Sequence, residues 1–232
     1  LVSTLKKPGK TFRGAPFWAW NAKLEPAELR RQIRIMHKMG LGGFFMHSRV
    51  GLGTEYLGGD WFKCIDACVD EARKLGMDAW LYDEDRWPSG AAGGKVTKDF
   101  PQYRNKYLSM RIGDEAGAGG GDLAWFAVKG LNESAVESYR RIAGPDAALA
   151  DGETAVTIAV RTADTSSWYN NGAYLDTLSE EAVAKFIEVT HEKYLAENGS
   201  EFGATIPGMF TDEPNFSSSQ PWTPTLPEVF RE

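Results

Sequence analysis

Cysteine and histidine are scarce: the chain of 232 residues has two cysteines and three histidines. Cys64 and Cys68 lie four positions apart in a segment of helical pattern, a spacing that suits packing on one helix face better than a disulfide. No other cysteine or histidine lies nearby in the sequence to complete a zinc site. We therefore expect two buried thiols rather than a disulfide or a metal pair.

Long hydrophobic runs and clustered positive charge are also missing. No stretch approaches the roughly 18 consecutive apolar residues of a membrane span, and no signal peptide is visible. The net charge is −6, and basic residues alternate with acidic ones along the predicted helices. Because a phosphate-binding face needs clustered Lys and Arg, we do not expect nucleic acid as a partner.

Four apolar runs end in polar residues of the kinds found in catalytic sites. The runs and the residues that follow them are 17–20 with Asn21, 44–46 with His47 and Arg49, 80–82 with Asp83, Glu84 and Asp85, and 209–210 with Asp212 and Glu213. Buried strands with polar residues at their carboxyl ends are typical of a parallel β/α sheet, whose carboxyl rim holds the chemistry. The sequence therefore predicts that these side chains share one rim.

Helical patterns separate the runs. Pro26 opens the first helix and Gly40 stops it. Asp60 is expected to cap the start of the second helix, which ends at Gly76. Ser179 opens a third helix that closes at 198–199. Residues 107–163 interrupt this order with short alternating strands. The order is β-α-β-α-β, an interruption, then α-β.

The expected fold class is α/β, a TIM (β/α)8-type barrel. Without the interruption, about 175 residues carry four β/α units, whereas a closed barrel typically needs about 250. We therefore expect a half-barrel fragment of the first four units with a small antiparallel β insertion. The expected domains are 1–106 (three units), 107–163 (insertion) and 164–232 (helix, fourth strand and start of the next unit). A longer protein, in which Leu1 is not the first residue, is expected to supply the other half.

Glu213 is the first catalytic candidate. It directly follows a predicted buried strand, and Pro214 holds it at the rim because proline cannot extend a strand ladder. Glycoside hydrolysis needs one carboxyl group as acid and a second as nucleophile or base. The alternative is a simple turn at residues 212–214.

Three adjacent acids, Asp83, Glu84 and Asp85, form the second candidate group. Like charges this close raise at least one pKa, which suits a general acid or a cation site. The alternative is a solvated acidic loop. Trp87, in the Trp-Pro-Ser-Gly sequence that follows, is a candidate platform for a sugar ring, whereas Trp61 and Trp80 are expected in the core.

Several of these segments resemble glycoside hydrolases of family 106, the α-L-rhamnosidase type. The resemblance rests on residues 15–21, 42–51, 80–90 and the sequence Phe-Thr-Asp-Glu-Pro at 210–214. It covers about residues 12–104 and 165–216 and leaves the insertion out.

The resemblance implies a bacterial, periplasmic or extracellular enzyme with a barrel. Such an enzyme removes terminal α-L-rhamnose or a similar sugar from plant-type or other complex glycans, with inversion, and calcium is the candidate cofactor. Glu213 and the acidic group at 83–85 match acidic positions of the family, while the second catalytic carboxylate is expected in the missing half. The predicted catalytic residues are Glu213 and Glu84, and the predicted substrate-binding residues are Asn21, His47, Arg49, Asp83, Asp85, Trp87 and Asp212.

Two other functions stay open. One is a retaining β-glycosidase of the broad barrel clan, although Asp212 stands where such enzymes usually have asparagine. The other is a non-catalytic carbohydrate-binding fragment. Sugar binding without turnover would distinguish the second from both enzymes.

Overall fold

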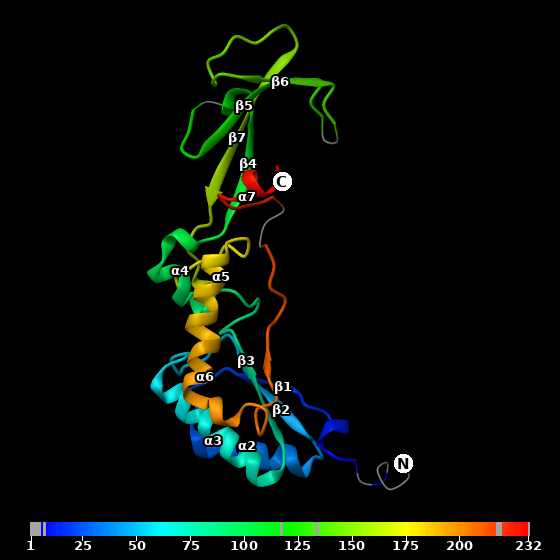
Figure 1. Ribbon diagram of the computed structural model, residues 1–232, viewed down its shortest axis with the longest axis vertical. Helices are drawn as coiled ribbons and strands as arrows, with labels where there is room; N and C mark the ends of the chain where they lie inside the picture. Colours follow the sequence, from blue (N-terminus) through cyan, green and yellow to red (C-terminus); the bar gives the residue numbers. More distant parts are fainter. Residues whose placement is uncertain (1–5, 7, 117, 133–134, 217–219, 232) are drawn as a thin grey trace. The chain divides into compact units, whose positions relative to one another are not determined.

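The computed structural model describes residues 6, 8–116, 118–132, 135–216 and 220–231. The chain divides into two compact units (Figure 1). Unit 1 comprises Leu1–Tyr103 and Thr165–Asn215, and unit 2 comprises Arg104–Asp164 and Phe216–Glu232. In the part of the chain so described, every helix is too short or too polar to cross a membrane.

Unit 1 is built on a four-stranded parallel sheet. Its strands are β1 (Phe17–Trp20), β2 (Gly43–Ser48), β3 (Asp78–Tyr82) and β8 (Met209–Phe210), and they pair in that order. Parallel pairing in chain order requires a crossover after each strand, which the intervening helices supply. The predicted parallel sheet is therefore confirmed, and the carboxyl ends of its strands lie at one edge.

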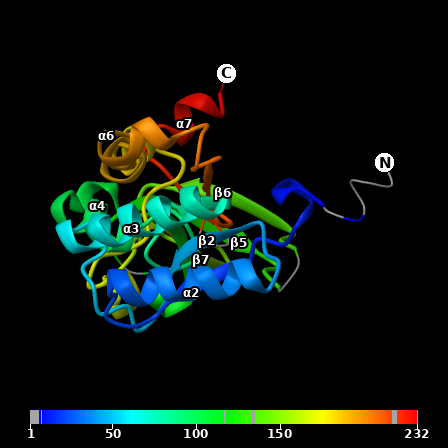
Figure 2. The same cartoon turned by 90° about the horizontal axis from the view of Figure 1, so that it is seen from below.

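Three helical segments cover one face of this sheet, with α2 and α3 side by side (Figures 1 and 2). The segments are α2 (Pro26–Lys38), α3 (Gly59–Leu75), and a continuous run of α5 (Glu180–Ile187), the π-helical turn η6 (Glu188–Glu192) and α6 (Lys193–Asn198). Pro26 opens α2 as expected, and Gly76 ends α3 in the left-handed conformation (φ +66°), which glycine adopts without strain.

Helix α3 begins differently from expectation. Its N-cap is Gly58, and Asp60 lies inside the first turn, where its carboxylate pairs with Lys63 at 2.8 Å. The carboxylate still faces the positive end of the helix dipole. The pattern located the helix start correctly but assigned its cap to the wrong residue.

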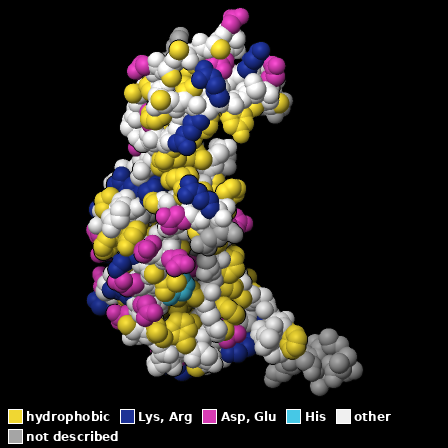
Figure 3. Space-filling model, turned by 45° about the horizontal axis from the view of Figure 1, so that its top comes forward, with side chains coloured by type: hydrophobic (Ala, Val, Ile, Leu, Met, Phe, Trp, Pro, Cys, Tyr) yellow, Lys and Arg dark blue, Asp and Glu magenta, His cyan; other side chains and the backbone are white. Residues whose placement is uncertain are grey.

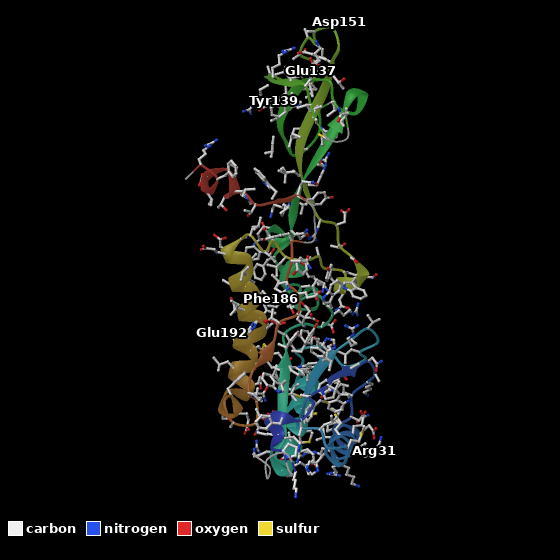
Figure 4. All side chains as sticks on the ribbon, turned by 90° about the vertical axis from the view of Figure 1, so that its right-hand side faces the viewer. Arg31, Glu137, Tyr139, Asp151, Phe186 and Glu192 are labelled. Atoms are coloured by element: carbon white, nitrogen blue, oxygen red, sulfur yellow. The ribbon has the colours of Figure 1, made fainter. Side chains whose placement is uncertain are left out.

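The third helical run was expected to be one regular helix, and a π turn interrupts it. Ser179 caps it as predicted, since its Oγ accepts a hydrogen bond from the Ala182 N–H at 3.3 Å. Phe186 faces the rest of unit 1, whereas Glu192 points away (Figure 4). The π turn contains His191, and such turns often occur at functional sites.

Shorter elements complete unit 1. They are η1 (Lys10–Phe12), η2 (Ala92–Gly94), α4 (Lys95–Asp99), η3 (Pro101–Tyr103), η5 (Ser167–Tyr169) and η7 (Gly199–Glu201).

The main core lies between the sheet and the helices. Trp61 and Cys68 of α3 are both 0% exposed, and Cys64 is buried beside them. The Trp61 indole N–H donates a hydrogen bond to the Tyr194 hydroxyl at 3.0 Å, which satisfies a donor that would otherwise be buried alone. The two cysteines are free thiols, as expected.

The opposite face of the sheet is curved and aromatic. The rings of Phe17 on β1 and Phe210 on β8 lie 5.0 Å apart, although three strand spacings of a flat sheet would separate their backbones by about 14 Å. Trp80 stacks on Phe45 on this face at 5.2 Å and is only partly buried, so it lies outside the helix-covered core where it was expected. Hydrophobic side chains accordingly reach the surface of unit 1 (Figure 3), and Phe17 is 51% exposed.

The sheet of unit 1 is open. Among the described residues, β1 pairs only with β2 and β8 only with β3, so no closed barrel is formed. The curvature is in the sense that a barrel requires, because side chains of the two edge strands meet on the concave face. The mixed α/β class is established, and the half-barrel stays a prediction.

Unit 2 is a five-stranded antiparallel sheet in the order β6-β5-β7-β4-β9. The strands are β4 (Lys106–Ile112), β5 (Asp122–Lys129), β6 (Ser138–Ile142), β7 (Glu153–Thr162) and β9 (Pro221–Trp222), with η4 (Gly113–Ala116) and α7 (Leu226–Val229). Residues 164–232 were expected to hold a helix, the fourth strand and the start of the next unit. In the structure β9 pairs with β4, and Phe216–Glu232 falls in unit 2.

Glu71 links α2 to α3 and gives a prediction for stability. Its buried carboxylate accepts hydrogen bonds from Arg34 Nε (2.6 Å) and Arg30 NH1 (3.4 Å), and the Arg34 hydrogen bond lowers its pKa. Glu71→Gln should lower the free energy of unfolding by about 1–2 kcal/mol at pH 7. A carboxylate with a lowered pKa stabilises the folded state above the pKa of about 4.3 of a free glutamate. The loss should therefore shrink as pH falls below that value, as measured by urea titration at several pH values.

The exposed Glu28, which pairs with Arg31 within α2, is the matched control. Glu28→Gln should change the urea midpoint much less. An equal effect of both variants at pH 7 would contradict a special role for the buried ion pair.

Candidate functional site

The three acids after β3 are buried beneath the rim. Asp83, Glu84 and Asp85 are 0%, 1% and 4% exposed. This burial rules out the alternative of a solvated acidic loop. Since buried charges need partners, the partners of each carboxylate indicate what it can do.

Glu84 is held entirely by backbone. Its Oε1 accepts hydrogen bonds from the N–H groups of Asp85 (2.8 Å) and Gly93 (2.6 Å). Its Oε2 accepts from those of Gly90 (3.0 Å), Ala91 (2.7 Å) and Ala92 (2.8 Å). Burial raises the pKa of Glu84 to about 7, and the N–H donors act against this increase. Five donors occupy both oxygens, so this geometry favours a structural role over the predicted catalytic one.

Asp83 ties two loops together. It accepts hydrogen bonds from Ser89 Oγ and Thr211 Oγ1, both at 2.6 Å, and His191 Nε2 lies 3.4 Å from its Oδ2. Ser89 also accepts a hydrogen bond from the Asp212 N–H (2.8 Å) and donates its own N–H to the Asp212 carbonyl (2.8 Å). Burial raises the pKa of Asp83, while the two hydroxyl groups lower it. Asp83 therefore positions the 211–213 segment rather than reaching solvent.

Asp85 is likewise a buried carboxylate that accepts hydrogen bonds from side chains of other segments. It accepts hydrogen bonds from Ser48 Oγ (2.7 Å) and Asn170 Nδ2 (2.9 Å), and Arg86 Nε lies 3.6 Å away. The guanidinium of Arg86 binds the carbonyls of Ser167 and Trp168, both at 3.0 Å. These hydrogen bonds hold the segment at residues 167–168 at the end of β3.

Glu213 occupies the rim itself. Its carboxyl group is exposed and accepts a hydrogen bond from the Trp87 indole N–H at 3.0 Å. Its φ of +45° is in the left-handed region, which is strained for a residue with a side chain. Strain of this kind is often retained at functional sites. Next to it, the Asp212 carboxylate accepts a hydrogen bond from the Tyr82 hydroxyl at 2.8 Å.

His47 lies on the concave face beside these residues. It is 5% exposed, and its ring centroid is 3.9 Å from that of Tyr82. Burial and the nearby Arg49 charge lower the pKa of His47 to about 4, so the ring is neutral at pH 7 and can both donate and accept one hydrogen bond. Arg49 and Asn21 are exposed at the ends of their strands.

The structure thus divides the predicted site residues into three sets. Trp87 and Glu213 are joined at the rim, and His47 and Asp212 both contact Tyr82. The acids at 83–85 form the buried support. Arg49 and Asn21 belong to the same edge of the sheet, with no contact that ties them to Glu213.

Four contributors were missed by sequence reasoning: Tyr82, Ser89, Asn170 and His191. Strand alternation places Tyr82 on the concave face with His47, a signal that was present in the pattern. His191 lies within a helical segment, where the sequence pattern gives no sign that it approaches Asp83. Ser89 and Asn170 lie in loops, and their partners depend on tertiary folding.

The acidic group does not fit the implied calcium ion. Calcium takes six to eight oxygen ligands, whereas the oxygens of residues 83–85 receive hydrogen bonds from N–H and O–H groups. Within the described ranges, no group of three or more His, Cys, Asp or Glu is arranged to hold a metal.

These features define a mixed α/β protein with a carboxylate-bearing rim on a parallel sheet. No protein-family model matches the chain, and no curated protein sequence matches it. Among solved structures, it is similar to a rhamnosidase from Novosphingobium sp. PP1Y, at 19% identity and a TM-score of 0.38. The likeness covers 54% of this chain and 15% of that protein, and it is too slight to bear on function.

Proposed function

We propose that unit 1 carries part of the active site of a glycoside hydrolase, with Glu213 as the proton-transferring carboxylic acid. The observation that carries the proposal is the pairing of an exposed carboxyl group with an exposed indole at the carboxyl edge of a parallel sheet. Glu213 and Trp87 are joined at 3.0 Å, and Trp87 is 41% exposed. An indole face stacks on a sugar ring, which would bring the glycosidic oxygen to the neighbouring carboxyl group.

The chemistry follows from what each residue can supply. Glu213 protonates the leaving glycosidic oxygen, and a second carboxylate serves as base or nucleophile. The carboxylates at 83–85 are engaged beneath the rim, so we assign the second carboxylate to the remaining half of the barrel in a longer protein. His47, Asp212 and Arg49 supply hydrogen bonds to sugar hydroxyls.

The proposed substrate is a terminal α-L-rhamnoside or a similar sugar on a complex glycan. The sequence resemblance at residues 15–21, 42–51 and 80–90 supports this choice over a β-glycoside. The natural polypeptide that contains residues 1–232 should release nitrophenol from p-nitrophenyl α-L-rhamnoside in preference to the β-glucoside and β-galactoside. Binding of rhamnose without release from any of the three would instead favour a carbohydrate-binding role.

Trp87 provides a separate test of the rim. Trp87→Phe keeps an aromatic face but removes the N–H that binds Glu213, so kcat/KM for the rhamnoside should fall about tenfold, the value of one hydrogen bond to a charged group. Trp125→Phe in unit 2 is the matched control and should leave kcat/KM unchanged. Equal effects of the two variants would remove Trp87 from the site.

A further inference from the structure

A cavity of about 440 Å³ opens in unit 1, beside the rim but separate from Glu213. Its lining comes from three segments: residues 52–56, residues 85–98 with the start of α4, and Asn170. The volume is within the usual range of about 300–1,000 Å³ for small-molecule sites, and it suits one or two sugar rings. Trp87 and Glu213 are not among the lining residues.

The walls of this cavity are fixed by buried contacts. Thr97 Oγ1 donates a hydrogen bond to the Ala173 carbonyl and accepts one from the Ala173 N–H, both at 2.8 Å. Gly94 and Gly172 approach so closely that a Cβ on Gly172 would lie 2.7 Å from the Gly94 Cα, and a Cβ on Gly94 would clash with the Tyr169 carbonyl oxygen. The two loops cannot separate without breaking these contacts, so the cavity is already formed before a ligand arrives.

Backbone strain is concentrated around the cavity. Leu57, Ala92, Asn170 and Asn171 have φ values of +58°, +50°, +51° and +66°, and each lines the cavity or adjoins a residue that does. Asparagine adopts this conformation readily, but for Leu57 and Ala92 it is strained and persists where the surrounding structure holds it in place. Two strained residues beside one cavity indicate that its shape is maintained against local preference.

The cavity presents hydroxyl-binding groups and a surplus cation. The 4% exposed carboxylate of Asp85 holds Asn170 at 2.9 Å, and each oxygen has a lone pair left for a sugar hydroxyl. Three basic residues (Arg86, Lys95 and Lys98) face two acidic ones (Asp85 and Glu55). Arg86 adjoins Asp85, and Lys95 pairs with Glu55 at 3.3 Å. Within the described ranges no ion pair involves Lys98, so one positive charge is left for a ligand anion.

Two exposed tryptophans connect the cavity to the catalytic candidate. Arg86, in the lining, binds the carbonyl of Trp168 at 3.0 Å, and the Trp168 indole N–H donates to the Trp87 carbonyl at 2.9 Å. Trp87 in turn binds Glu213. Trp168 and Trp87 are 42% and 41% exposed, so both offer surface to a sugar chain.

We propose that this cavity is a second saccharide subsite that accepts a sugar bearing a carboxylate, such as a uronic acid. In this arrangement Lys98 pairs with the sugar carboxylate. The Asn170 amide already donates to Asp85 and to the Gly93 carbonyl, so the oxygens of Asp85 and Asn170 serve as acceptors for the sugar hydroxyls. The inference rests on the proposed function, since it assigns the substrate to acidic glycans whose uronic acid lies a short distance from the cleaved bond.

The test measures binding rather than cleavage. Digalacturonate and the neutral digalactose differ in their carboxylates and are titrated calorimetrically into the Glu213→Gln variant. Digalacturonate should bind about fivefold more tightly, the upper value for a solvent-accessible ion pair, and added salt should reduce the difference. Lys98→Met keeps the apolar stem and should abolish the preference. Lys38→Met, at the exposed end of α2, should leave it intact.

Three outcomes would overturn the proposal: no binding of either saccharide, equal binding of both, or a preference that survives Lys98→Met. Failure of the proposed catalytic function is recognised separately, by the absence of nitrophenol release from the unsubstituted protein. An acid preference that depends on Lys98 would still establish the subsite in that case.

Discussion

Glu213→Gln should reduce kcat for the aryl rhamnoside by about 10²- to 10⁴-fold, the usual contribution of general acid catalysis. Glutamine has the shape of glutamate but carries no transferable proton. The amide oxygen can still accept the Trp87 N–H that now lies 3.0 Å from Oε2, so the rim should keep its form. KM should accordingly change little.

Leaving-group dependence makes this test sharper. A substrate with a more acidic phenol needs less protonation, so the loss should be smaller for dinitrophenyl than for nitrophenyl rhamnoside. Glu192→Gln is the matched control, because this side chain is exposed and points away from unit 1 (Figure 4). Near wild-type turnover by Glu213→Gln would exclude Glu213 as the acid.

The parallel sheet was predictable because its signals are local. Apolar runs ending at Trp20, Met46, Tyr82 and Phe210 needed only alternation and burial to be identified as strands. The order of the strands followed from the helices between them. Unit 2 was predictable in part for the same reason, since the alternating segments expected at 107–112, 123–129 and 155–161 correspond to β4, β5 and β7. Two strands, β6 and β9, were not predicted, and the two residues of β9 carry no pattern.

The roles of the acids were not predictable in the same way. Three adjacent carboxyl groups suggested charge repulsion and catalysis, but their function depends on partners that no spacing reveals. Glu84 binds backbone N–H groups that are presented only because Gly90 and Gly93 adopt positive φ values of +135° and +60°. Asp83 binds Thr211, which is distant in the chain. Tertiary folding determined these contacts.

Removal of the Glu84 carboxylate should have the largest effect on stability. Glu84→Ala leaves five backbone N–H groups at residues 85 and 90–93 without their acceptor, in a region where the side chain is 1% exposed. An unsatisfied buried donor costs about 1–3 kcal/mol, and entering water would satisfy only some of the five, so we expect a loss of at least about 3 kcal/mol. Urea unfolding followed by tryptophan fluorescence measures it.

Removal of the Glu84 carboxylate should also disturb the rim. The loop that Glu84 organises carries Ser89, which hydrogen-bonds to both the N–H and the carbonyl of Asp212. The free energy of unfolding of Glu84→Gln should lie between those of the wild type and Glu84→Ala. The amide oxygen of glutamine can accept hydrogen bonds from one group of backbone N–H donors, whereas its NH₂ cannot accept from the other group. Glu197→Ala on the exposed face of α6 should stay within about 0.5 kcal/mol of the wild type. If Glu84→Ala unfolded at the wild-type urea concentration but lost its glycosidase activity, Glu84 would be a catalytic carboxylate rather than the centre of a structural loop.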